Sequence, residues 1–163
     1  MRDLMTYARE CMEYLDVIGI KYGNIIAFET NTRAKKRWGQ CRAVPGGYII
    51  NINTVLLDER NDENGLINTI IHELLHSCEG CMNHGEKWKC LAEIVHREYG
   101  LNIKRTASAE EKGVQEETCP TNYKYQFRCQ GCGKIVGRNR ASRFTKNYKF
   151  YCCGKCGGSF EQI

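Results

Sequence analysis

The sequence predicts an α+β protein, in which a helix, a small antiparallel sheet and two further helices precede a small cysteine-rich unit. Three observations carry this prediction. Apolar residues recur at helical spacing in three stretches, short β-prone runs lie between the first two stretches, and two Cys-x-x-Cys-Gly motifs stand near the C-terminus. With 163 residues, of which 42% are hydrophobic, the chain can bury one ordinary core and carry a small appendage.

The first part of the chain is expected to form a helix over residues 4–15 and then a small sheet. The β-prone runs are Asn24–Thr30, Arg37–Arg42 and Gly47–Asn53, and the turn sequence Pro45-Gly46-Gly47 joins the last two. Strands linked by such tight turns run antiparallel, so we expect an antiparallel sheet.

Two more helices are expected after the sheet. The first follows the polar stretch 58–65, is apolar around most of its circumference and should end near Gly80, which is typical of a buried helix. The second is predicted over Glu86–Tyr99, with Trp88 on its inward stripe and Gly100 as its stop.

A division into two functional parts is predicted from composition and charge. Residues 104–122 lack apolar periodicity, so we interpret them as a linker between a domain at 1–103 and a second domain at 123–163. From residue 119 onward nine basic residues oppose one acid, whereas residues 1–118 hold 15 basic and 18 acidic residues. The chain is therefore slightly acidic and then strongly basic, with charges of −3 and +8.

The cysteine spacing and the N-terminal sequence indicate a cellular setting. The chain has eleven cysteines, and several stand in Cys-x-x-Cys pairs, a spacing typical of metal sites in reduced compartments. The N-terminus carries charges where a signal peptide is apolar, and no apolar run reaches membrane length. We therefore expect a cytoplasmic protein that makes no contact with a membrane.

The buried helix contains the sequence His72-Glu73-Leu74-Leu75-His76. Histidines at positions i and i+4 lie on one helix face, where both imidazoles can bind one zinc ion, and Glu73 then lies beside the open coordination position. The pattern predicts a catalytic zinc with Glu73 as general base. The alternative is a helix whose two histidines form ordinary hydrogen bonds in the core.

A catalytic zinc commonly has three protein ligands, so a third one is needed. His84 is the best candidate, because it lies eight residues after His76 in a sequence that favours a loop turning back toward the helix. His96 on the following helix is the rival. It would otherwise be a partly exposed helix residue.

The two Cys-x-x-Cys-Gly motifs predict a second, structural zinc site in a zinc ribbon. Its ligands are expected to be Cys129, Cys132, Cys153 and Cys156, because twenty residues between the pairs match the spacing of four-cysteine zinc sites. Cys152 is an alternative to Cys153. A unit this small should take much of its folding free energy from the metal.

Basic and aromatic residues alternate between the two cysteine pairs. Such residues can neutralise phosphates and stack on unpaired bases, so we expect contact with DNA. The alternative is a solvated surface whose aromatic rings pack over the zinc site. The basic residues predicted to bind nucleic acid are Arg138, Arg140, Arg143, Lys146 and Lys149.

A further Cys-x-x-Cys pair, Cys78 and Cys81, directly follows the metal helix. It could be a redox pair or an additional metal site, but small core residues or surface thiols are the simpler interpretation.

Several motifs together resemble those of the SprT-like metalloprotease family. They are His72–His76 followed by His84–Trp88, preceded by Arg37–Cys41 and Ile49–Asn53, and the resemblance covers nearly the whole chain. It implies a minimal zincin fold with a zinc site formed by the three histidines already named. Spartan-type relatives are DNA-dependent proteases that degrade proteins crosslinked to DNA.

The resemblance thus implies a zinc endopeptidase with His72, His76 and His84 as ligands and Glu73 as general base, acting on DNA-associated or DNA-crosslinked proteins. A role in DNA repair and an association with the nucleoid would follow. Two alternatives stay open. One is a non-proteolytic, zinc-dependent nucleic-acid-binding or regulatory protein, and the other is a protease whose ribbon recognises protein.

Overall fold

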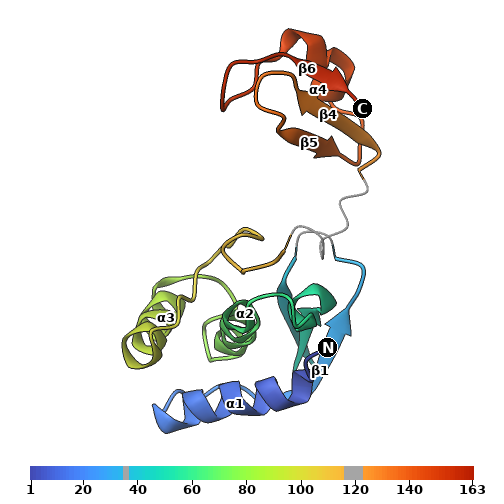
Figure 1. Cartoon of the computed structure of the whole chain (residues 1–163). Coiled ribbons are helices and arrows are strands. Elements are labelled where there is room, and N and C mark those ends of the chain that lie inside the picture. The colour runs from blue at the N-terminus through green and yellow to red at the C-terminus, as the bar shows by residue number, and fades with distance from the viewer. Residues whose placement is uncertain (35–36, 116–122) are drawn as a thin grey trace. The chain divides into compact units, whose positions relative to one another are not determined.

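The computed structural model describes residues 1–34, 37–115 and 123–163, and the chain divides into two compact units, Met1–Cys119 and Pro120–Ile163 (Figure 1). Each unit has its own hydrophobic core, so the two are described separately. Both combine helices with a small sheet, which agrees with the predicted α+β class. Every described helix is too short or too polar to span a membrane.

The helices of the first unit begin and end at residues whose chemistry explains their bounds. Asp3 caps the first helix by accepting a hydrogen bond from the backbone N–H of Thr6 at 2.8 Å, and Asp62 caps the central helix in a similar way. Gly100 ends the third helix in the left-handed conformation, with φ of 67°, as predicted. These elements are α1 (Leu4–Val17), the 3-10 helix η1 (Thr54–Leu57), α2 (Glu63–His76) and α3 (Glu86–Tyr99).

The sheet of the first unit is mixed, so the prediction of an antiparallel sheet is wrong for one strand. The strands β1 (Ile25–Asn31), β2 (Gly39–Val44) and β3 (Gly47–Asn53) lie in the order β1-β3-β2. β2 and β3 form the expected hairpin, but β1 pairs with β3 in parallel. The fully buried Ile50 and Ile52 place β3 at the centre of the sheet. Strand direction alternates along the chain from β1 to β2 to β3, so β1 and β3 run in the same direction.

Helix α2 lies at the centre of the first unit, between α1, α3 and the sheet (Figure 1). It is buried around most of its circumference, as its composition predicts. It ends at His76 and not near Gly80, because the backbone N–H and the hydroxyl of Ser77 both donate to the carbonyl of Leu74 and close the helix. Its fully buried apolar residues are Leu66, Ile70, Ile71, Leu74 and Leu75.

The segment 104–115, predicted as the start of a linker, packs against the first unit instead. The indole N–H of Trp38 donates to the carbonyl of Ala107 at 3.0 Å, and Lys112 and Val114 are buried. The residues of this segment that contact the first unit do not recur at a regular spacing, which explains why its sequence shows no apolar periodicity. The predicted boundary at residue 103 therefore moves toward the C-terminus, and the rest of the predicted linker, 116–122, lies outside the described residues.

The second unit is a small three-stranded antiparallel sheet with one short helix. Phe127 in the central strand is fully buried and packs with Phe160, Cys129 and Cys153. The sheet order is β5-β4-β6. The elements are β4 (Tyr125–Cys129), β5 (Ile135–Arg138), α4 (Arg143–Asn147), the 3-10 helix η3 (Tyr148–Phe150) and β6 (Phe160–Gln162).

Candidate functional site

Three imidazoles of the first unit converge on one point. His72 and His76 lie one turn apart on the same face of α2, and His84 lies in the loop between α2 and α3. The Nε2 atoms are 3.2 Å apart between His72 and His76, 3.1 Å between His76 and His84, and 3.0 Å between His84 and His72. The structure therefore brings together the three predicted ligands.

Hydrogen bonds at the Nδ1 atoms of two of these rings fix the direction in which their Nε2 lone pairs point. Nδ1 of His72 lies 2.9 Å from the carbonyl oxygen of Lys104, and Nδ1 of His76 lies 2.8 Å from that of Cys81. A carbonyl only accepts, so both rings carry their proton on Nδ1 and Nε2 is an unprotonated donor of electrons. Two such nitrogens this close repel each other unless a cation lies between them.

Zinc fits this donor set. Nitrogens bound to one tetrahedral zinc at about 2.05 Å would lie about 3.3 Å apart, near the observed separations. Ordinary core hydrogen bonds, the alternative interpretation, explain the Nδ1 contacts but not the convergence of three Nε2 atoms.

His96, the rival ligand, lies elsewhere. It is exposed on α3, and its Nδ1 lies 3.1 Å from the carbonyl oxygen of Leu101. Within the described part of the chain, the metal-ligating group of the first unit contains His84 and not His96.

Glu73 follows His72 on α2 and is a buried carboxyl, with only 6% of its surface exposed. A side chain at Gly39 in β2 would clash with it, since a Cβ there would lie 2.7 Å from Cγ of Glu73. Burial raises the pKa of Glu73 to about 7. The backbone N–H of Cys41 and the positive charges of Lys112 and Arg37 lower this pKa and so offset part of the effect of burial. A carboxyl with a pKa near neutrality can both accept and return a proton at neutral pH.

The indole of Trp88 covers one side of the imidazole cluster. Its ring centroid lies 4.6 Å from that of His84, 4.8 Å from that of His72 and 5.6 Å from that of His76. The periodicity of α3 predicts that Trp88 is buried but not that it touches these rings. Its packing restricts the orientation of all three imidazoles.

Lys112 is a site residue that the sequence analysis missed. Its side chain is 8% exposed, and burial lowers its pKa to about 8. The negative charges of Glu73 and Glu111 raise this pKa and offset part of the effect of burial. The positive charge of Lys112 favours the ionised form of Glu73. No signal in the sequence marks it, because lysine is ordinarily a solvated residue and its segment has no apolar period.

The pair Cys78 and Cys81 consists of buried core thiols. Burial raises the pKa of Cys78 to about 11 and also raises that of Cys81, so both stay protonated and unreactive at neutral pH. Neither belongs to a metal-ligating group of the described residues. Cys81 supports the site through its backbone carbonyl, which accepts the Nδ1–H of His76.

The four predicted ribbon cysteines also converge. Their sulfurs lie within 4.8 Å of one another, with 3.4 Å between Cys129 and Cys156 and 3.7 Å between Cys132 and Cys153. Sulfurs bound to one tetrahedral zinc at about 2.3 Å would lie about 3.8 Å apart, so the group fits zinc. Cys152 is exposed and lies outside the group.

The turns that carry these cysteines have the geometry the glycines predict. Gly133 and Gly157 follow the two pairs with φ of 72° and 73°. Backbone N–H groups of Lys155 and Cys156 lower the pKa of Cys153 to about 6, which favours the thiolate that a metal requires.

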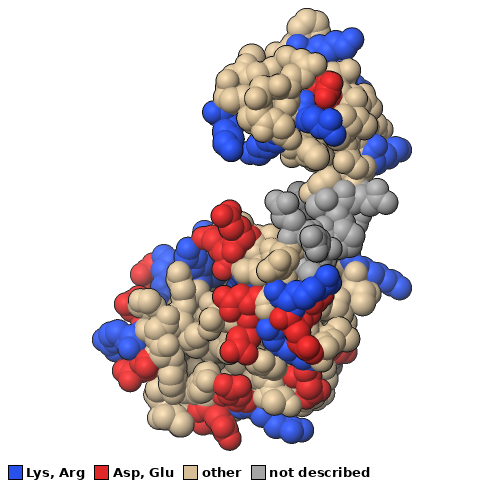
Figure 2. Space-filling view, in the orientation of Figure 1, with Lys and Arg blue, Asp and Glu red and all other residues tan. Residues whose placement is uncertain are grey.

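The second unit carries a strongly basic surface (Figure 2). Arg128 pairs with Glu161 at 3.9 Å, and no other ion pair forms within residues 123–163. The five residues predicted to bind nucleic acid are all exposed: Arg138, Arg140, Arg143, Lys146 and Lys149.

The aromatic residues between the cysteine pairs divide into two groups. Phe144 and Tyr148 pack against Phe127, with ring centroids 5.0 Å and 4.9 Å away, so they belong to the core of the unit. Phe150 is 87% exposed and Tyr151 is 38% exposed. Tyr151 also packs edge-on against Phe144, with 5.3 Å between ring centroids. The packing alternative therefore holds for Phe144, Tyr148 and one side of Tyr151, and Phe150 is the ring most available to a partner.

Fold and site together define an α+β protein with a three-histidine site and a four-cysteine site, each suited to zinc. The chain belongs to the SprT-like family, whose model matches residues 9–107. It is also 29% identical over 161 residues to "Protein SprT-like" of Oceanobacillus iheyensis, covering 94% of this chain and 95% of that protein. The resemblance deduced from the sequence motifs is thereby confirmed.

Proposed function

We propose that this protein is a zinc-dependent endopeptidase of the zincin type that cleaves proteins bound or crosslinked to DNA. One observation carries the proposal: three Nε2 atoms lie 3.0 to 3.2 Å apart, and the residue that follows the first of these histidines on α2 is a buried carboxyl, Glu73. A carboxyl with a pKa of about 7 at this place is suited to proton transfer at neutral pH.

The chemistry is divided between the metal and the chain. Zinc held by His72, His76 and His84 would supply a Lewis acid that activates water and polarises a peptide carbonyl. Glu73 accepts the proton of the attacking water and returns it to the leaving amine nitrogen. Lys112 favours the ionised form of Glu73 before that transfer.

DNA is the partner that the second unit suits best. Its exposed cations can neutralise phosphates, and Phe150 offers an exposed ring on which an unpaired base can stack. A ribbon bound to DNA would bring the protease to proteins on that DNA. The role in DNA repair and a place in the cytoplasm, at the nucleoid, belong to this proposal.

The enzyme claim is tested with zinc-loaded wild-type protein, Glu73→Gln, and the matched control Glu79→Gln, whose carboxylate is exposed just beyond α2. Each is incubated with DNA-binding proteins, crosslinked or not, in the absence of DNA and with single- or double-stranded DNA. We expect cleavage by wild type and Glu79→Gln and at least about 100-fold slower cleavage by Glu73→Gln. Equal cleavage by all three, or cleavage by none, removes the enzyme claim.

The DNA claim is tested separately, by replacing Arg138, Arg140 and Arg143 with alanine. We expect weaker, less salt-dependent DNA binding and loss of any DNA stimulation of cleavage, with DNA-independent cleavage retained. Unchanged DNA binding would favour a ribbon that recognises protein. DNA binding without cleavage by the wild type would favour the non-proteolytic alternative.

A further inference from the structure

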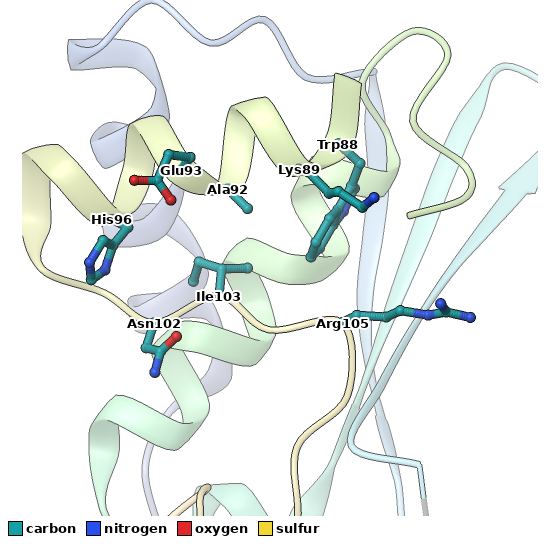
Figure 3. Close-up of a pocket in the computed structure, with 8 residues that line it drawn as sticks. All are labelled: Trp88, Lys89, Ala92, Glu93, His96, Asn102, Ile103 and Arg105. Atoms are coloured by element: carbon teal, nitrogen blue, oxygen red, sulfur yellow. The ribbon is translucent and has the colours of Figure 1, made fainter. Parts of the chain in front are cut away.

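A pocket of about 340 Å³ lies between α3 and the chain segment that follows this helix (Figure 3). Its apolar wall is formed by three buried residues, Trp88, Ala92 and Ile103, which are 2%, 7% and 8% exposed. The polar lining residues are Lys89, Glu93, His96, Asn102 and Arg105.

The pocket shares residues with the imidazole cluster. Trp88 forms its wall on one side and packs on the three imidazoles, 4.6 to 5.6 Å away between ring centroids. Arg105, which also lines the pocket, directly follows Lys104 in the chain. The backbone of Lys104, beside Arg105, accepts a hydrogen bond from His72. A chain bound at the metal can therefore reach the pocket.

The lining chemistry distinguishes between occupants. Lys89 is already paired with Glu86 at 2.8 Å, and the charges of Arg105 and Glu93 offset each other, so the pocket has no excess positive charge to attract a phosphate. Ala92 is the smallest residue of the apolar wall, and the space above it is where a larger side chain of a ligand fits. An apolar floor under a polar rim is typical of a site that buries a side chain while the attached backbone stays hydrated.

We propose that this pocket binds a large aliphatic or aromatic side chain of the polypeptide substrate, one to three residues from the cleaved bond. This inference rests on the proposed endopeptidase function. The distance of one to three residues from the cleaved bond follows because each residue of an extended chain spans about 3.3 Å. Such a short segment is enough to pass from the metal site to the pocket on the other side of the Trp88 ring. Ala92 sets the size of side chain that fits and Trp88 forms the surface on which it packs.

The test compares zinc-loaded wild type, Ala92→Leu and the matched control Cys90→Leu, which makes a similar change on α3 at an exposed position outside the pocket. Asn102→Trp, at the exposed rim, fills the pocket without changing the helix. Each variant digests a mixture of degenerate peptides, and mass spectrometry of the products gives kcat/KM as a function of the residue at each position. Circular dichroism shows which variants are folded.

Wild type and Cys90→Leu should prefer Leu, Met or Phe at one fixed position near the cleaved bond. The pocket-filling variants should cleave those peptides about 10- to 100-fold more slowly and peptides with Gly or Ala there less than about 3-fold more slowly. Cleavage by the wild type with no such preference, or an equal loss for all peptides in Asn102→Trp, overturns the pocket and leaves the endopeptidase intact. No cleavage by the wild type overturns the endopeptidase, and the pocket assignment with it.

Discussion

Replacing Cys153 with serine should remove zinc from the second unit and unfold that unit while the first unit stays folded. Cys153 is one of four converging sulfurs and is also one of four buried residues in the core of its unit. Cys152→Ser is a matched control, because it makes the same change one residue earlier at an exposed sulfur outside the group.

The expected loss of stability in Cys153→Ser follows from the small size of the core of the second unit. Burial of Phe127 and Phe160 contributes about 3 kcal/mol each, whereas a structural zinc contributes about 10 to 16 kcal/mol at neutral pH. Loss of one of four ligands should cost about a quarter of the zinc term, roughly 3 kcal/mol or about 100-fold in zinc affinity. A unit that depends on the metal to this degree should then be largely unfolded at low zinc.

The assay has two readouts. Metal analysis should give two zinc ions per chain for wild type and Cys152→Ser and one for Cys153→Ser. Limited proteolysis should cut Cys153→Ser within residues 123–163 and leave the first unit intact. Equal zinc loss in both serine variants, or two zinc ions in Cys153→Ser, would refute the ligand assignment and the reasoning from core size.

Three further predictions follow from single residues. His84→Ala should lower the zinc content by one ion per chain, and His96→Ala should leave it unchanged. In zinc-free protein, burial and then the charges of neighbouring histidines lower the pKa of His72 to about 3, whereas the unfolded residue titrates near 6.5. The unfolded chain thus binds a proton that the native one refuses, so the free energy of unfolding should fall by up to about 1.4 kcal/mol per pH unit below pH 6.5. Urea titrations at pH 5, 6 and 7, followed by tryptophan fluorescence, measure this slope, and His72→Gln should flatten it. Gly157→Ala, at φ of 73°, should destabilise the zinc-loaded second unit by about 1 to 2 kcal/mol in thermal unfolding, and Gly154→Ala, with open space around it, by less than about 0.5 kcal/mol.

Local chemistry in the sequence predicts the features of this fold that depend on nearby residues. The bounds of α3 follow from its apolar stripe and from Gly100, and the position of the β2–β3 hairpin follows from Pro45-Gly46-Gly47. The end of α2 does not, because Ser77 bonds to Leu74 in a way that any serine after a helix could adopt or avoid. The direction of β1 depends on which strand takes the centre of the sheet, and that choice is made by tertiary burial.

The ligand sets were predictable because metal coordination imposes spacing on the sequence. His72 and His76 must be one helical turn apart, and the cysteine pairs must form tight turns. Residues that support the ligands have no such constraint. Lys104 and Cys81 act through backbone carbonyls that any residue could supply, and Lys112 acts through a buried charge that runs against the ordinary preference of lysine.

The two metal sites therefore depend on zinc for different reasons. The histidine site is built on α2, whose buried apolar residues belong to a core that spans α1, α3 and the sheet, so the first unit has what it needs to fold without metal. The carbonyls that bind its imidazoles belong to Cys81, which precedes α3 in the chain, and to Lys104, which follows α3. The fold itself therefore holds these imidazoles in place before zinc binds. The cysteine site belongs to a unit whose core includes two of its own ligands, Cys129 and Cys153. Moderate chelation should consequently remove zinc from the first unit while leaving it folded, and should unfold the second unit. Under the proposed function, loss of peptidase activity and loss of DNA affinity should then follow zinc removal through separate events that circular dichroism can tell apart.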